Sequence, residues 1–150
     1  MDMRQGLVRH GLTLFLAGLL TGFFIPLTAN PRAGLAGHLE GVGNGTFLIA
    51  LGCAWPLLGL AAGAARAVYG LVLFGTWANW IGTTLSAILG TSKATPIAGA
   101  GHAGTPLQEN LVLAILVATG FAMVGAVGTA VWRLWRGGAP ADSAVPGATH

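Results

Sequence analysis

Few side chains in this sequence could bind a cofactor or move a proton, and three of them lie together in one block, HLEGVGNG. His38 offers an imidazole nitrogen, the commonest protein ligand for metals. Glu40 and Asn44 are four residues apart, so on a helix they share a face where a carboxylate and an amide could act together. Asn79 is a further amide inside a later apolar segment. Because the sequence has no P-loop, no G-x-S-x-G and no zinc-binding spacing, this small polar set is the candidate for the chemistry.

The same block carries glycines at a regular interval beside the histidine. Gly37, Gly41 and Gly45 recur at every fourth residue, which places them on one narrow side of a helix. His38 borders that side. Close packing of two helices is one explanation, because small residues let backbones approach. The other is a flat cofactor that lies on the glycines and is ligated by His38, which makes Gly41 and Gly45 candidate cofactor-binding residues.

The distribution of charge predicts the elements that must position these residues. Only 7% of the 150 residues are Asp, Glu, Lys or Arg, against about 25% in soluble domains, and the mean hydropathy is +0.74. No formal charge occurs at 10–31, 41–65, 67–92 or 110–132, and a membrane-spanning helix needs about 20 such residues. The sequence therefore predicts an all-α integral membrane protein, a bundle of four transmembrane helices at about 6–28, 36–60, 67–90 and 106–135.

The basic residues predict how this bundle is oriented. The N-terminus, the second loop and the C-terminus carry Arg4, Arg9, Arg66, Arg133 and Arg136. The first and third loops carry only Arg32 and Lys93. The positive-inside rule then places both termini in the cytoplasm. The basic residues are scattered and form no patch, so a nucleic-acid partner is not expected.

The N-terminal helix and the C-terminal tail are predicted from length and composition. A cleaved signal peptide is the alternative for the first run, but the run is longer than the about 7–15 residues of a signal core, and no A-x-A-like site follows it. We expect it to be a retained helix. Residues 137–150 are rich in Gly, Ala, Ser and Pro, which predicts a disordered tail.

Structural explanations compete with functional ones for two of the polar residues. Glu40 could be solvated at headgroup depth, near the positive end of a helix dipole, and Asn79 could form an interhelical hydrogen bond. A carboxylate inside a membrane is costly, however, and is by default a candidate for function. Glu40, Asn44 and Asn79 are therefore predicted as catalytic residues, with the structural roles left open.

Longer sequence blocks carry a resemblance to a known family. RHGLTLFLAGLLTGFFIPLTANPRAGLAGHLEGVGNGTFLIALG, then GTWANW, then TPIAGAGHAG followed by QE, resemble hydroxylaminobenzene mutase over about residues 9–135. A more distant similarity is to styrene oxide isomerase, another small membrane isomerase with four helices. It is carried by His10 and Gly11, by the H-x5-N-G pattern of His38, Asn44 and Gly45, and by WAN at 77–79.

These resemblances imply a reaction and a cofactor. The mutase resemblance implies a bacterial membrane enzyme that converts an aromatic hydroxylamine, hydroxylaminobenzene, to 2-aminophenol by moving the hydroxyl from nitrogen to the ortho carbon. The isomerase resemblance implies haem b with His38 as the axial ligand of its iron, and a trimer with haem at the subunit boundary. Asn44 would then orient the substrate oxygen, Glu40 would transfer a proton or stabilise a cation, and Asn79 would support Asn44.

Three other functions are compatible with the same residues. A small transporter or pore could be lined by Glu40, Asn44 and Asn79, and a purely structural membrane subunit could use them for packing. An epoxide isomerase is the third. The sequence differs from the styrene oxide isomerases at two site positions, since Gly75 and Thr83 stand where that family has an aspartate and a tyrosine.

Overall fold

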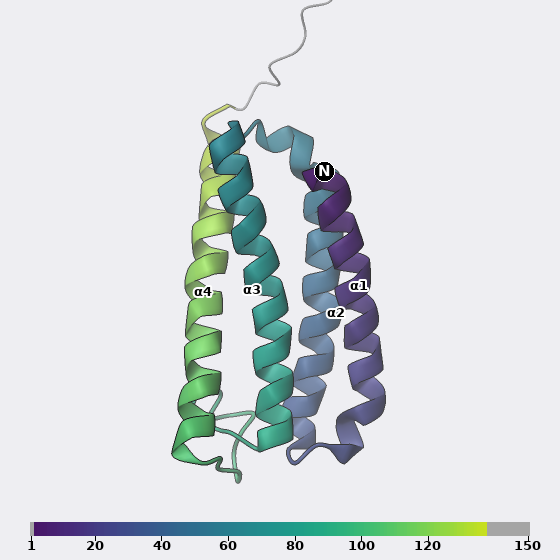
Figure 1. Ribbon diagram of the computed structural model, residues 1–150, viewed down its shortest axis with the longest axis vertical. Coiled ribbons are helices and arrows are strands. Elements are labelled where there is room, and N and C mark those ends of the chain that lie inside the picture. Colours follow the sequence, from purple (N-terminus) through teal and green to yellow (C-terminus); the bar gives the residue numbers. More distant parts are fainter. Residues whose placement is uncertain (1, 138–150) are drawn as a thin grey trace, which may run out of the picture.

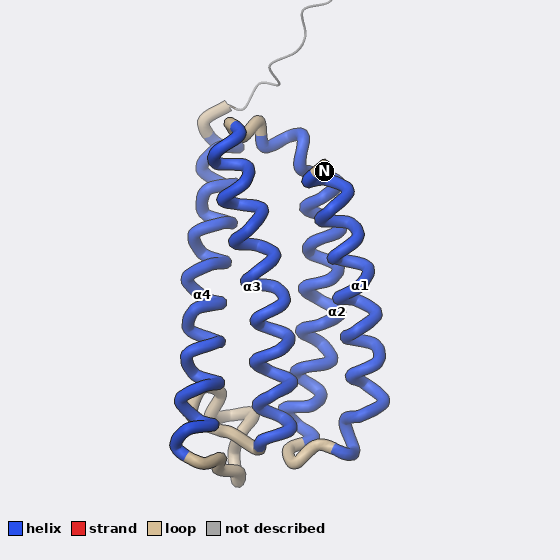
Figure 2. The backbone as a smooth tube through the Cα atoms, in the orientation of Figure 1, coloured by secondary structure: helices blue, strands red, loops and turns tan. Residues whose placement is uncertain are grey.

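Four long helices make up the computed structural model, which describes residues 2–137. They are α1 (Met3–Phe24), α2 (Pro31–Ala54), α3 (Ala62–Leu89) and α4 (Pro106–Trp135). Short 3-10 helices, η1 (Ile25–Leu27) and η2 (Trp55–Leu58), follow α1 and α2 (Figure 2). All four long helices are long and apolar enough to cross a membrane, and residues 2–137 contain no strand. The predicted all-α, four-transmembrane-helix fold is confirmed.

Two of the helices, α2 and α3, begin five residues earlier than the sequence suggested. α2 begins at Pro31 rather than near residue 36, and α3 begins at Ala62 rather than near 67. At α2 the cause is a strong helix N-cap followed by proline. Asn30 accepts hydrogen bonds from the backbone N–H groups of Arg32 and Ala33, and proline is well suited to the first helical position. Arg32 and Arg66 therefore lie inside α2 and α3, close to where these helices begin. Residues 138–150 of the tail that the sequence predicts to be disordered lie outside the described residues.

The helices lie side by side in chain order, as an open array (Figure 1). α1 packs on α2, α2 on α3, and α3 on α4, whereas α4 has no comparable contact with α1 or α2 in the described part of the chain. Both described ends and the α2–α3 connection lie at one end of the array (Figure 1). The α1–α2 turn and the long connection between α3 and α4 lie at the other.

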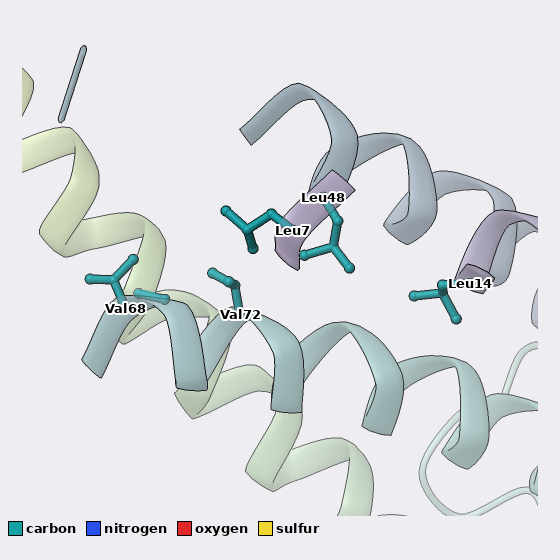
Figure 3. Close-up of a cluster of buried hydrophobic side chains, with 6 residues drawn as sticks. Leu7, Leu14, Leu48, Val68 and Val72 are labelled. Carbon is teal, nitrogen blue, oxygen red and sulfur yellow. The ribbon is translucent and has the colours of Figure 1, made fainter. Parts of the chain in front are cut away.

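The shared core lies where α1, α2 and α3 meet. Its buried members are Leu7, Leu14, Leu48, Val68 and Val72 of these helices, which Figure 3 labels, together with Ala126 of α4. Large apolar side chains also point outward, among them Phe23 and Phe121, each 79% exposed. Such exposure would be a liability in water but suits helices that face lipid.

Glycines bring α1 and α2 into backbone contact. A methyl group added at Gly45 would lie 2.5 Å from the backbone nitrogen of Phe15 and 2.7 Å from the carbonyl oxygen of Gly11. Gly41 faces Gly18 in the same way. These contacts are the close packing that small residues allow between membrane helices, so the packing explanation of the glycine pattern is the one that the structure supports.

We expect Gly45→Ala to destabilise the fold and Gly43→Ala to leave it intact. The new methyl at 45 meets backbone atoms that cannot turn aside, whereas the position at 43 has no atom within 4 Å. Overpacking of this kind costs about 1–3 kcal/mol. Unfolding of the two purified variants in mixed micelles measures the difference. Equal stability of both variants would contradict the α1–α2 contact.

The long α3–α4 connection is held in place by side chains of α2 and α4. The Glu109 carboxylate accepts hydrogen bonds from the backbone N–H groups of Ser92, Lys93 and Gly104, at 2.8–3.1 Å. Asn30 donates from Nδ2 to the carbonyl oxygen of Ala98 at 2.9 Å. The connection is therefore attached both to α4 and to the start of α2. Glu109, in the first turn of α4, thus organises this loop.

Candidate functional site

The three residues predicted as catalytic meet at the contact of α2 with α3. Oε2 of Glu40 accepts a hydrogen bond from Nδ2 of Asn44 at 3.1 Å and another from Nδ2 of Asn79 at 2.5 Å. All three side chains are half-buried. The second carboxylate oxygen, Oε1, has no hydrogen-bond partner among residues 2–137. One oxygen thus holds the carboxylate in place and the other is available to a ligand.

The depth of Glu40 argues against a solvated carboxylate at the membrane surface. Glu40 is nine residues into α2, which is about 14 Å at 1.5 Å per residue. At that depth a charged or polar group needs partners within the protein. Asn44 and Asn79 are those partners, and both belong to helices long enough to span a membrane. The arrangement suits a carboxylate that exchanges a proton with a bound molecule.

The role expected for Asn79 differs from what the structure shows. Asn79 was expected to support Asn44, yet both amides donate to Glu40. The reason is geometric, since the Glu40 carboxylate lies between the two helices and accepts from an amide on each of them. Asn79 in turn lies in a firmly hydrogen-bonded part of α3, where the hydroxyl of Thr83 donates to its carbonyl oxygen at 2.8 Å. Glu40 is therefore the centre of the cluster.

His38 lies on a different side of α2 from this cluster. At 100° per residue, His38 and Glu40 are about 200° apart around the helix. The His38 ring faces α1, where Nδ1 lies 2.8 Å from the carbonyl oxygen of Gly18. Nε2 has no hydrogen-bond partner among residues 2–137. A histidine whose one nitrogen is held by a carbonyl and whose other nitrogen is free has the arrangement of a metal ligand.

Gly41 and Gly45 do not form a cofactor surface. Both are buried in the α1–α2 contact, where the backbone of α1 covers them. A flat group cannot lie on these two glycines, so that prediction is wrong. A helical wheel shows that residues share a side but not what lies against it. Gly43, in the same GVGNG stretch, is the exposed glycine.

Residues that carry the resemblance contact one another in space. The His10 and Trp77 rings meet edge to face, with centroids 6.3 Å apart, and Trp77 meets Trp80 in the same way at 5.8 Å. Trp80 donates from its indole nitrogen to the Thr21 hydroxyl at 3.1 Å. The WAN block thus contributes one residue to the aromatic contact with α1 and another, Asn79, to the Glu40 cluster.

The two positions that differ from the styrene oxide isomerases also have structural roles here. Gly75 makes room for Met123 of α4, because a methyl at 75 would lie 2.6 Å from its sulfur. Thr83 is buried and uses its hydroxyl within α3. Neither position therefore provides a carboxylate or a phenol in this chain, and Glu40 is the carboxylate of the cluster.

Sequence reasoning missed the contribution of α1. Gly18 and Gly22 lie against His38, with Gly22 so close that a methyl there would be 3.0 Å from Nδ1. The sequence did contain evidence for this contribution, because Gly11, Gly18 and Gly22 fall within about 40° of one another on a helix. That spacing indicates a bare side of α1, although it does not identify the residue that packs there.

Comparisons with known proteins agree with the expected family. The model of the styrene oxide isomerase family matches residues 3–135. Hydroxylaminobenzene mutase HabB of Ectopseudomonas oleovorans is 45% identical over 147 residues, 97% of this chain and 90% of the relative. Hydroxylaminobenzene mutase HabA of the same organism is 45% identical over 115 residues, 76% of this chain and 85% of the relative. The chain belongs to this family of membrane isomerases, which favours an enzyme over a transporter or a structural subunit.

Proposed function

We propose that this member of the styrene oxide isomerase family is a hydroxylaminobenzene mutase. Its substrate is an aromatic hydroxylamine, and its product is 2-aminophenol. The observation that carries the proposal is the Glu40 carboxylate, held between two asparagine amides inside the membrane with one oxygen free. The 45% identity to two mutases over most of the chain supports the same reaction.

The Glu40 cluster provides the proton transfers that this isomerisation needs. In the reaction the N–O bond breaks, a bond forms between oxygen and the ortho carbon, the ortho C–H proton leaves and the nitrogen gains a proton. Substrate and product have the same composition, so no oxidant or reductant is consumed. Oε1 of Glu40 can accept the ring proton and return it to nitrogen. Asn44 and Asn79 keep the carboxylate fixed, and the surrounding apolar helices exclude the water that would compete for a cationic intermediate.

A haem group is the cofactor that we propose, and the residues present fit it. His38 has Nδ1 paired with a backbone carbonyl and Nε2 free, so His38 would hold the haem through Nε2. Bound there, haem iron would supply a Lewis acid that weakens the N–O bond. Residues 2–137 contain no group of three His, Cys, Asp or Glu side chains that could hold a metal ion by themselves.

The opposite orientations of His38 and Glu40 support an oligomer. Within one chain α2 stands between them, so one substrate cannot reach both groups. In an oligomer, His38 of one subunit can lie opposite Glu40 of a neighbouring subunit, and the pair then forms one site. The resemblance to styrene oxide isomerase favours a trimer with the cofactor at the subunit boundary.

The position of the label after reaction in oxygen-18 water tests the mutase reaction. Transfer within one molecule predicts 2-aminophenol without label, because its phenolic oxygen comes from the substrate hydroxyl. Mass spectrometry of the product from purified enzyme measures this directly. Styrene oxide, offered in parallel, tests whether the chain also isomerises an epoxide.

Label in the phenol, or the para isomer as the main product, would show that water attacks a free cation and would contradict the proposal. Turnover of styrene oxide without turnover of hydroxylaminobenzene would assign the chain to the other activity of its family.

We also propose that the protein lies in the bacterial inner membrane with both termini in the cytoplasm. The N-terminal end, the α2–α3 connection and the end of α4 lie at the same end of the array (Figure 1). Four of the five arginines counted from the sequence are in these segments, and Arg66 lies near the start of α3, just after the connection. The positive-inside rule favours the cytoplasm for this end. A fluorescent protein fused after Arg136 is expected to fold and fluoresce, and alkaline phosphatase at the same point to be inactive. The reverse result would contradict this orientation.

A further inference from the structure

Two glycines of α1 form the surface against which the His38 ring lies. The carbonyl oxygen of Gly18 is 2.8 Å from Nδ1. A methyl group at Gly22 would be 3.0 Å from Nδ1 and 3.3 Å from Cε1. These separations are tighter than ordinary contacts between carbon and ring atoms, so the ring occupies space that only glycine leaves free.

The contact with Gly18 also determines where the proton of the neutral imidazole lies. A carbonyl oxygen can only accept a hydrogen bond, so Nδ1 must carry the hydrogen. The lone pair of the neutral ring is then on Nε2, the nitrogen without a partner among residues 2–137. A hydrogen bond of this kind fixes the tautomer and the orientation of a ligating histidine.

We propose that Gly18 and Gly22 are positioning residues for His38. The Gly18 carbonyl selects the Nδ1–H tautomer, and the bare backbone at Gly22 lets the ring take the orientation that presents Nε2 to a metal-centred cofactor. The part that concerns the cofactor rests on the proposed function. The part that concerns the ring and its tautomer does not.

Gly22 is the position at which this arrangement can be changed without dismantling the fold. A methyl at Gly18 would lie 2.5 Å from the backbone nitrogen of Val42, so a variant there would separate α1 from α2. The three atoms nearest to a methyl at Gly22 all belong to the His38 ring, and none of them is a backbone atom. Gly22→Ala therefore displaces the ring and weakens its bond to Gly18, while the helix contact remains.

The tautomer is tested on the cofactor-free protein by nitrogen NMR of histidine-labelled samples. His38→Ala identifies the His38 signals among those of the four histidines. The wild-type protein is expected to show the Nδ1–H form at His38. Gly22→Ala is expected to shift the ring toward a mixture of tautomers. Gly43→Ala, a methyl added on α2 where no atom lies within 4 Å, is the matched control and is expected to match the wild type.

Cofactor retention is the second measurement. Gly22→Ala is expected to bind haem about 10- to 100-fold more weakly than wild type, the usual effect of losing such a supporting contact, and to shift the iron–histidine stretching band. Gly43→Ala should leave both unchanged.

The outcomes separate this proposal from the proposed function. An Nε2–H tautomer in the wild type, or identical His38 signals in wild type and Gly22→Ala, would overturn the positioning role. Haem affinity and spectrum unchanged in Gly22→Ala would overturn it as well. A wild-type protein that binds no haem would instead overturn the cofactor proposal, and with it the purpose assigned to the two glycines.

Discussion

A His38→Ala variant is expected to lose both haem and turnover. His38 is the side chain whose free nitrogen, Nε2, is presented by a fixed ring, and alanine offers no replacement ligand. The purified wild-type protein should show the Soret band of haem in its visible spectrum, and the variant should be colourless. Loss of hydroxylaminobenzene isomerisation should accompany the loss of colour, because both depend on the same nitrogen.

Two other histidines provide controls for this result. His10 lies in α1 with its ring against Trp77, and His102 lies in the α3–α4 connection. His10→Ala and His102→Ala are expected to keep haem. A colourless wild-type protein that remains fully active with an iron chelator would contradict the haem proposal, and so would a His38→Ala protein that retains the band.

The second large effect is expected from Glu40→Gln. Glutamine has almost the same shape, and its amide oxygen can take the place of Oε2 and still accept from Asn44 and Asn79. The folded structure should therefore remain, while the group that accepts the ring proton is lost. General acid–base groups typically contribute about 100- to 10,000-fold to a rate. The measurement is kcat for 2-aminophenol formation, with haem content as the check on folding.

Matched variants show whether the loss of kcat results from the change at the Glu40 cluster. Glu109→Gln changes the other carboxylate in the spans, which holds the α3–α4 connection, and should weaken the loop rather than lower kcat. Asn79→Ala removes one of the two donors to Glu40 and should fall between wild type and Glu40→Gln. Full activity in Glu40→Gln would place the proton transfer elsewhere.

Co-expression of His38→Ala and Glu40→Gln tests whether each site is formed by two subunits. If each site takes its histidine from one subunit and its carboxylate from another, mixed oligomers of His38→Ala and Glu40→Gln contain some intact sites. Activity should return in complexes purified through tags on both chains. Mixed complexes that stay inactive would show that the two groups act within one chain, or that the oligomer brings other surfaces together.

The helices and the Glu40–Asn44 pair could be predicted from the sequence because both depend on local spacing. Long runs without charge require membrane spans, and residues four apart on a helix share a face whatever surrounds them. Helix starts were predicted less well. The start of α2 was predicted near residue 36, whereas Asn30 and Pro31 determine where it begins.

Only the tertiary structure decided which helix faces each residue. The angle of a residue about its own helix follows from its number, but the neighbour at that angle depends on how all four helices pack. That packing placed Asn79 against Glu40, covered Gly41 and Gly45 with the backbone of α1, and turned His38 toward Gly18. Lipid gives apolar side chains no preference for one helix over another. Close glycine contacts and polar pairs therefore determine the arrangement, and they act between residues far apart in the chain.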